Sequence, residues 1–270
     1  MKPLPAAAPA IHLHPMRQPS RRRPTPTARL IVRLLGGLLA GLVLIPVPAA
    51  GAPDRNRVEA LIVEGTNDFR RSADLPPVTR NARLTSAAAD FAAYMARTDR
   101  YGHEADGRSP AQRATAHGYD YCIVLENIAY EQSSVGFRTE ELAADFVDGW
   151  RRSPPHRRNM LDPAVVDTGV AVGHSARTGR YYGVQMFGLP HAARIAFSIA
   201  NRSRSSVRYT LGEKSYRLEP GAINTHEQCT PPALTLRTPG GRTDMRMQPK
   251  DGQRFAVVPD GAGGVRLQSR

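Results

Sequence analysis

Apolar residues recur at helical spacing in two stretches between residues 55 and 101. The stretches run from Arg55 to about Ala73 and from Leu84 to about Tyr101, and Pro76-Pro77 lies between them. Their apolar residues are three or four positions apart, which is typical of a helix with one buried face. These residues are Val58, Leu61, Ile62, Phe69, Leu84, Ala87, Ala88, Phe91, Tyr94 and Met95. We therefore predict two amphipathic helices.

Two further helices are indicated by the residues at their ends. The first is a short helix capped by Ser109 and ended by Gly118, since serine is favoured at a helix start and glycine just past its end. The second opens with Thr139-Glu140-Glu141, whose acidic side chains suit the first turn. It ends at Pro154-Pro155, because proline cannot continue a helix. The segment between these helices contains LENIAY and is predicted to be irregular.

Strand patterns dominate the rest of the chain. The runs TGVAVGHS and RYYGVQMFG are joined by Ala176-Arg177-Thr178-Gly179, which predicts a hairpin. After Pro190 the texture changes to short alternating runs separated by Gly, Pro and Asn; they are IAFSIANRS, VRYTLG, SYRLEPG, PALTLRTPG and RFAVVPD. Such runs favour a small all-β domain, which we place at residues 191–270. The fold class expected for the whole chain is α+β.

The first 49 residues have the pattern of a signal peptide. A basic, proline-rich segment without acidic residues extends to Arg33, and the apolar run LLGGLLAGLVLI and the small residues of PVPAAGAP follow it. The apolar run is too short to cross a bilayer comfortably. We predict cleavage after Ala49 and a secreted or periplasmic location. An uncleaved membrane anchor is the alternative.

The net charge of +13 is weak evidence for a nucleic-acid partner, because much of it lies in the predicted signal peptide. The remaining basic residues are nearly all arginines, and the arginines around His156 are not interleaved with aromatic residues in a way that suggests base stacking. We therefore expect no nucleic-acid partner. Arg151, Arg152, Arg157 and Arg158 are interpreted as a solvated, ion-paired surface around the end of a helix.

The sequence contains two cysteines, Cys122 and Cys229. In an exported protein two thiols can form a single disulfide. Two buried free thiols are an equally acceptable interpretation. In either case one bridge is too few for a disulfide scaffold, so a hydrophobic core must stabilise the fold.

An ordered set of motifs resembles the CAP superfamily (cysteine-rich secretory proteins, antigen 5, pathogenesis-related one), in its bacterial secreted branch. The motifs are LPP at 75–77, RYGH at 100–103, DGRSPxxR at 106–113, ENIA at 126–129, WxxSPxHRxNML at 150–161, TGVAV at 168–172 and VQMFG at 184–188. Each motif alone is weak, and their common order is specific. The resemblance implies a three-layer α-β-α sandwich at residues 50–190, followed by the β-rich accessory domain.

The resemblance also implies a central cavity lined by His103, Glu126 and His156. Asn127, Trp150 and Ser153 belong to the same motifs and are expected to support the site. Ser153 stands where many animal and plant members carry a second glutamate, so the full set of four residues is absent.

Two imidazoles and a carboxylate from separate segments can bind a divalent metal ion such as zinc, or can hold one another by hydrogen bonds. His103 and His156 are the candidate metal ligands. No close pair such as H-x-x-x-H supports a zinc site, and neither Ser153 nor Cys122 has the partners of a nucleophile. We therefore assign no catalytic residue, and the interpretation leans away from an enzyme.

The stretch WRRSPPHRRNML raises the question of why a helix ends in Pro-Pro-His. Pro154 and Pro155 restrict the chain where it leaves Ser153. We predict that this turn directs His156 into a cleft shared with His103 and Glu126.

These observations favour an exported CAP-domain protein whose cavity binds a small or lipid-like ligand, with a divalent metal as a candidate cofactor. The lipid-like character is implied by the resemblance only. The alternatives are a metal-dependent hydrolase of the cell envelope and a purely structural envelope module. The β-rich domain is expected to contact an envelope partner.

Overall fold

A computed structural model describes residues 51–237 and 245–269. The predicted signal peptide and its cleavage site lie outside these ranges. Within them, no helix combines the length and the apolar character needed to cross a membrane.

The four predicted helices are confirmed, and a fifth follows them. The helices are α1 (Arg55–Arg71), α2 (Ala82–Thr98), α3 (Pro110–Ala116), α4 (Thr139–Arg152) and α5 (Pro154–Met160). The prediction of a simple turn at Pro154-Pro155 is wrong, because these prolines begin α5. Proline suits the first helical turn, where its missing N–H would have no partner in any case. Only Ser153 is extended, with ψ 115°, and it separates α4 from α5.

A four-stranded sheet lies at the centre of residues 51–190. Its strand order is β1-β3-β4-β2, with bounds β1 (Thr79–Arg80), β2 (Tyr121–Glu131), β3 (Asp167–His174) and β4 (Tyr181–Pro190). The predicted hairpin is confirmed as β3 and β4. The prediction of an irregular segment around LENIAY is wrong, since this segment is β2, which pairs with β4 along its length. Both of its faces are covered, so it lacks the alternation that marks a half-exposed strand.

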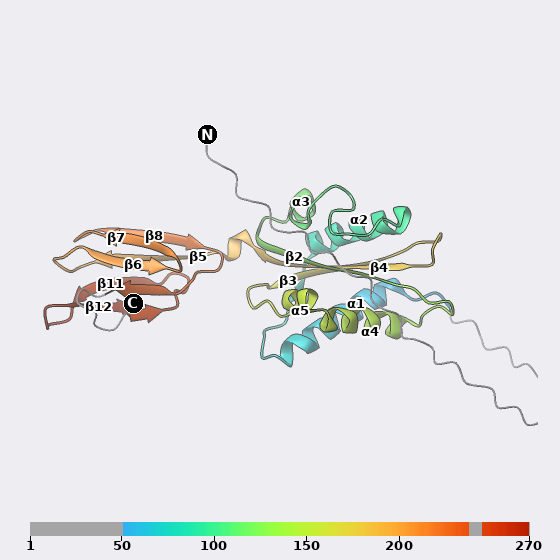
Figure 1. The fold of residues 1–270 in the computed structure, drawn as a ribbon, viewed down its shortest axis with the longest axis horizontal. Helices are drawn as coiled ribbons and strands as arrows, with labels where there is room; N and C mark the ends of the chain where they lie inside the picture. The colour runs from blue at the N-terminus through green and yellow to red at the C-terminus, as the bar shows by residue number, and fades with distance from the viewer. Residues whose placement is uncertain (1–50, 238–244, 270) are drawn as a thin grey trace, which may run out of the picture. The chain divides into compact units, whose positions relative to one another are not determined.

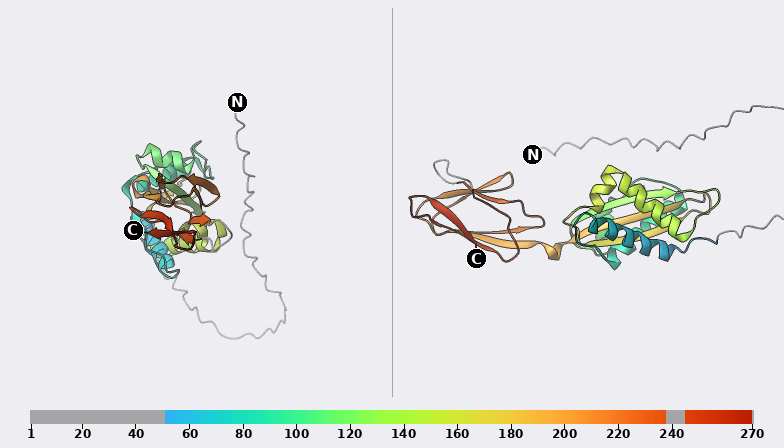
Figure 2. Two further views of the ribbon diagram at one scale, coloured as in Figure 1. Left: turned by 90° about the vertical axis from the view of Figure 1, so that its left-hand side faces the viewer. Right: turned by 90° about the horizontal axis from the view of Figure 1, so that it is seen from below.

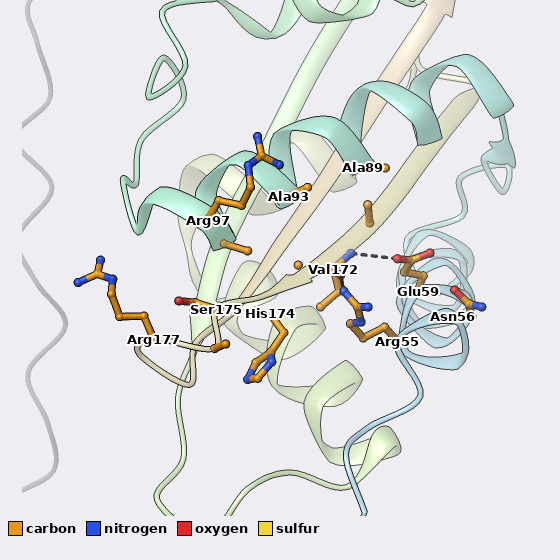
Figure 3. A pocket seen from close by; sticks show the side chains of 14 residues that line it. Arg55, Asn56, Glu59, Ala89, Ala93, Arg97, Val172, His174, Ser175 and Arg177 are labelled. Atoms are coloured by element: carbon orange, nitrogen blue, oxygen red, sulfur yellow. Dashed lines mark hydrogen bonds between the residues drawn. The ribbon is translucent and has the colours of Figure 1, made fainter.

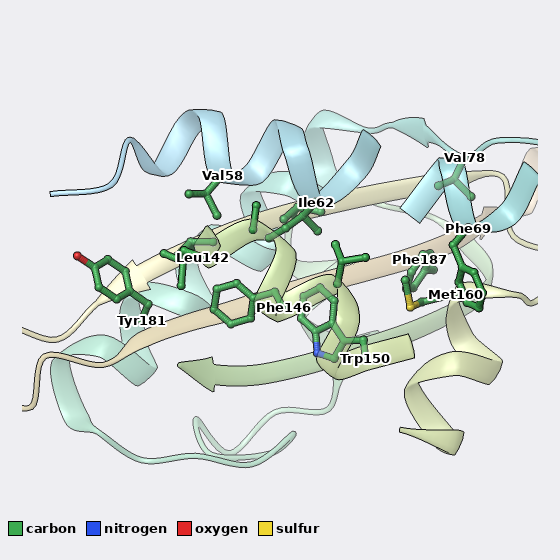
Figure 4. Close-up of a cluster of buried hydrophobic side chains, with 14 of the residues drawn as sticks. Val58, Ile62, Phe69, Val78, Leu142, Phe146, Trp150, Met160, Tyr181 and Phe187 are labelled. Atoms are coloured by element: carbon green, nitrogen blue, oxygen red, sulfur yellow. The ribbon is translucent and has the colours of Figure 1, made fainter. Parts of the chain in front are cut away.

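Helices cover both faces of this sheet (Figures 1 and 2). On one face α2 and α3 pack against the strands, and on the other α1, α4 and α5 do so. Figure 4 shows the second interface, where Trp150, Phe146 and Ile62 are fully buried among other apolar side chains. The predicted three-layer α-β-α sandwich is therefore confirmed.

Two glycines of β3 allow α2 to lie unusually close to the sheet. A Cβ atom at Gly169 would lie 2.2 Å from the backbone carbon of Leu84, and one at Gly173 would lie 2.4 Å from the carbonyl oxygen of Ala92. Real Cβ atoms do not approach backbone atoms so closely. The position of α2 therefore depends on the missing side chains at Gly169 and Gly173.

After a short 3-10 helix, η1 (His191–Ala193), the chain forms the expected all-β region. Two four-stranded sheets have the orders β10-β9-β6-β7 and β12-β11-β5-β8. Their bounds are β5 (Ile195–Asn201), β6 (Val207–Leu211), β7 (Lys214–Leu218), β8 (Ile223–Gln228), β9 (Leu234–Arg237), β10 (Met245–Met247), β11 (Arg254–Pro259) and β12 (Val265–Ser269). A separate apolar cluster that includes Phe197, Tyr209 and Phe255 forms the core of this region.

Cys122 of β2 and Cys229, just after β8, form a disulfide across a sequence separation of 107 residues. The sequence left open a disulfide or two buried free thiols, and the structure contains the disulfide.

Candidate functional site

The candidate residues meet along the outer edge of β2, which is an edge strand of the central sheet. Main-chain carbonyl groups on this edge accept hydrogen bonds from both sides. The Ile128 carbonyl accepts from the Tyr101 hydroxyl at 3.1 Å, and the Glu126 carbonyl accepts from Asn159 Nδ2 at 3.1 Å. Tyr101 precedes His103 on the loop after α2, and Asn159 lies on α5. The strand edge therefore attaches the segments that carry the two histidines.

Glu126 is the most enclosed member of the site, with a side chain only 1% exposed. Arg113 Nη2 donates to both of its oxygens, at 2.9 and 2.8 Å, and His103 Nδ1 lies 2.8 Å from Oε1. A buried carboxylate is costly unless it is paired and hydrogen-bonded. Glu126 meets both conditions through Arg113 and His103.

Arg113 is the functional residue that sequence reasoning missed. Its side chain is 3% exposed and lies over the Phe91 ring, 3.6 Å from the ring centroid. It also donates to Asp106 and to the carbonyl groups of Arg108 and His103. The available signal was its position as the last residue of DGRSPxxR, a motif to which no chemistry was assigned.

His103 is oriented by the buried carboxylate. Because Glu126 is an acceptor, the hydrogen bond places the proton on Nδ1 of His103. The ring is 44% exposed. In the neutral form of this ring, Nε2 therefore carries the lone pair and solvent can reach the ring.

His156 lies on the first turn of α5 and is partly buried. Burial and, to a smaller extent, the positive charge that His103 carries when it is protonated lower the pKa of His156 to about 4. Its Nδ1 is buried without a hydrogen-bond partner in the described part of the chain. At neutral pH His156 is therefore a neutral imidazole with unused hydrogen-bonding capacity.

Asn127 connects β2 to α5 through its side-chain amide. This structural role explains its place in the motif. Its Nδ2 donates to the His156 carbonyl at 3.2 Å, and its Oδ1 accepts from Asn159 at 2.9 Å. These bonds fix the backbone of His156 relative to the strand that carries Glu126.

Trp150 and Ser153 contribute in other ways. Trp150 is 1% exposed and stacks on Phe146, so it belongs to the core (Figure 4). Its Nε1 also lacks a partner among the described residues. The N–H of Ser153 ends α4 by donating to the carbonyl groups of Gly149 and Trp150, so Ser153 sets where α5 begins.

The arginines around His156 form surface contacts. Arg151 pairs with Asp148 at 3.3 Å, and the guanidinium groups of Arg151 and Arg157 each lie 4.7 Å from the centroid of the Phe69 ring. The expected ion-paired surface is thus partly a cation–π arrangement on Phe69.

Two hollows of the molecule open beside α2. One of about 620 Å³ opens beside β3, between α1 and α2, and is lined by Glu59, Val172 and several arginines (Figure 3). The other, of about 340 Å³, lies between α2 and α3 and reaches Arg113. His103, Glu126 and His156 line neither hollow. Within residues 51–237 and 245–269 no three His, Cys, Asp or Glu side chains are grouped so as to hold a metal ion.

The order of these elements and motifs agrees with a known family. Residues 63–187 match the model of the cysteine-rich secretory protein family, CAP. This part of the chain is a CAP domain. The match includes His103, Arg113, Glu126 and His156, and it excludes the leader and the β-rich region.

Several solved structures are similar to this part of the chain. An outer surface protein from Borrelia burgdorferi is 16% identical with a TM-score of 0.45, over 52% of this chain and 98% of that one. An extracellular SCP-domain protein from Bacillus anthracis is 21% identical with a TM-score of 0.41, over 50% and 41%. A cysteine-rich secretory protein from Staphylococcus aureus is 19% identical with a TM-score of 0.38, over 50% and 39%. The last two are matched over about two fifths of their length. No curated protein matches the chain.

Proposed function

We propose that this CAP-domain protein is exported and binds a small ligand at the edge of β2. A divalent metal ion, held by His103 and His156, is the candidate cofactor of this site. One observation carries the proposal: the neutral His156 ring has a buried, unpartnered Nδ1 at a site shared with the oriented His103. A buried polar atom without a partner costs free energy, and a bound group that reaches it recovers that cost.

The donor set fits a cation bound by two imidazoles. Neutral imidazole nitrogen is a favoured ligand for zinc. Ligating histidines commonly donate their other ring N–H to a carboxylate, and His103 does so to Glu126. Glu126 itself is not assigned as a ligand, because Arg113 and His103 already occupy its oxygens. A two-imidazole site binds more weakly than the usual set of three or four ligands.

The role proposed for the site is binding rather than catalysis. The lipid-like ligand class and the envelope location are parts of the same proposal, supported by the CAP match at residues 63–187 and by the leader. Mass spectrometry of exported protein tests the location, with a mature chain that begins near Ala50 as the expected result. A product that retains the apolar run of residues 34–45 would identify an anchor.

A zinc titration tests the site. Binding to the folded state alone stabilises it by about 2.7 kcal/mol when zinc is at a hundred times its dissociation constant. For a domain of this size we expect the thermal midpoint to rise by about 5 to 10 °C, and a chelator should reverse the shift.

His103→Ala and His156→Ala should each abolish the shift. Arg157→Ala is the matched control, because Arg157 is adjacent to His156 in the sequence but contacts Phe69. An unchanged wild-type midpoint at millimolar zinc would remove metal from the proposal and favour a bracing network built on Arg113 and Glu126. A shift that survives both histidine changes would place the metal elsewhere.

A further inference from the structure

The sheet β10-β9-β6-β7 presents a row of arginines on its exposed face. Arg208 of β6 is directly opposite Arg237 of β9 on one side and Arg217 of β7 on the other. All three side chains are exposed. Side chains directly opposite on neighbouring strands lie on the same face, with Cβ atoms about 5 Å apart. Three like charges therefore stand side by side.

Most of this charge is not neutralised. Arg217 contacts Glu219 at 2.6 Å and Ser206 at 2.9 Å. In the described part of the chain no hydrogen bond, ion pair or ring contact engages the side chains of Arg208, Arg237 or Arg246, and Arg246 lies opposite Thr235. Like charges directly opposite on a sheet are destabilising. The row thus costs stability and does not contribute to the fold.

The rest of the face is hydroxylic and lacks exposed aromatic rings. Thr210 lies opposite both Thr235 and Ser215, next to the arginine row. The tyrosines of these strands turn the other way, since Tyr209 is fully buried and Tyr216 stacks on it with ring centroids 5.2 Å apart. Proteins that bind single-stranded nucleic acid stack bases on aromatic side chains, and this face has none to offer.

We propose that this face of the β-rich region binds a linear polymer with repeated phosphate groups and no bases, such as a phosphodiester-linked polyol chain. Guanidinium groups bind phosphate oxygens in a bidentate manner. The strands are about 4.8 Å apart, so the row from Arg237 to Arg217 spans about 10 Å and can contact successive groups of one polymer. Thr210, Thr235 and Ser215 can bond the remaining oxygens.

The test uses long-chain inorganic polyphosphate and protein spanning residues 50–270. The variant Arg208→Gln/Arg237→Gln should lower the affinity at low salt at least tenfold. It should also reduce the slope of log K against log salt by about two, because two phosphate contacts are lost. The control, Arg254→Gln/Arg266→Gln, removes the same charge from exposed positions on β11 and β12 of the other sheet and should change the affinity less than twofold.

Thermal midpoints complete the design. The double variant should be as stable as the wild type or more stable, since it removes a like-charge contact. Arg246→Gln provides a second variant outside the Arg208–Arg237 contact and should weaken polyphosphate binding about threefold.

Equal losses of affinity in the Arg208→Gln/Arg237→Gln variant and in the Arg254→Gln/Arg266→Gln control would overturn the proposal, because net charge alone would then explain binding. Tighter binding of a single-stranded DNA oligonucleotide than of polyphosphate of equal charge would identify a nucleic-acid surface, and tighter binding of polygalacturonate would identify a carboxylate polymer.

Discussion

The guanidinium group of Arg113 extends from α3 and is buried next to α2 and β2. The Phe91 ring covers one face of the guanidinium, and the carboxylates of Asp106 and Glu126 contact its edge. In such an environment each ionised group depends on its partners, because the interior screens charge poorly. Arg113 therefore holds the Glu126 side chain in place, and through Glu126 it determines the orientation of His103.

Replacing Arg113 should be severely destabilising. Arg113→Met leaves Glu126 and Asp106 without their cation, and the loss of one partner from a buried pair costs about 3 to 5 kcal/mol. Urea denaturation measures the loss. Arg108→Met is the control, since the Arg108 side chain is exposed, and it should change stability by less than about 0.5 kcal/mol. A similar small effect of Arg113→Met would contradict the account.

His156 should make stability depend on pH. Its pKa of about 4 in the folded protein lies below the ordinary value of 6.5, so the unfolded chain binds the proton more readily. The contribution is fully present above pH 6.5 and is lost as pH falls from 6.5 toward 4. With an allowance for partial exposure of the ring, we expect a loss of about 1 to 2 kcal/mol between pH 7 and pH 5. His156→Gln should remove that part of the slope, and an identical slope in the variant would show that other groups cause it.

At the scale of elements, the close contact of α2 with β3 can be tested with two glycines. Gly169→Ala puts a methyl group against the backbone of α2 and should destabilise the protein by about 3 kcal/mol. Gly149→Ala makes the same change inside α4, where the nearest atom is Glu131 Oε1 at 4.0 Å. It should stabilise by about 0.5 to 1 kcal/mol, because alanine is the better helix former. Calorimetry of both variants distinguishes a packing effect from a general effect of added methyl groups.

The elements also show what the sequence could and could not predict. The helices α1, α2 and α4 each have one polar face, so their periodicity was readable. The strand β2 is covered on both sides, and its pattern has no period that separates it from a loop. The Pro-Pro stretch signalled an interruption correctly, but the same prolines also suit the start of a new helix, and only tertiary contacts such as Asn127 with the His156 carbonyl decide between the two.

The sequence identified three residues of the candidate site but not the hydrogen bonds that join them. His103, Glu126 and His156 were named from motifs, and the structure brings their segments to one strand edge. The role of Arg113 could not be read from the sequence, because its partners come from two segments: the loop after α2 supplies Asp106 and the His103 carbonyl, and β2 supplies Glu126. A buried arginine is recognised by what surrounds it, and a linear pattern does not contain that information.

At the scale of the whole molecule, a disulfide joins the CAP domain to the β-rich region in addition to the chain that connects β4 to β5. The bridge between Cys122 and Cys229 closes a loop with a sequence separation of 107 residues. In the chain-entropy description a loop of this length stabilises by about 4 to 5 kcal/mol. Reduction followed by alkylation should therefore lower the thermal midpoint clearly. Equal midpoints for the oxidised and the alkylated protein would show that the bridge contributes little.

The most direct test of the central claim observes the imidazole nitrogens themselves. Long-range proton–nitrogen correlation spectra of the protein spanning residues 50–270 should be recorded at pH 7 as zinc is added. The account predicts that Nε2 of His103 and the ring of His156 shift together, while Nδ1 of His103 keeps its proton and its bond to Glu126. The resonances of His117, His174, His191 and His226 should remain in place. Zinc-dependent shifts confined to those four histidines would contradict the assignment of the site.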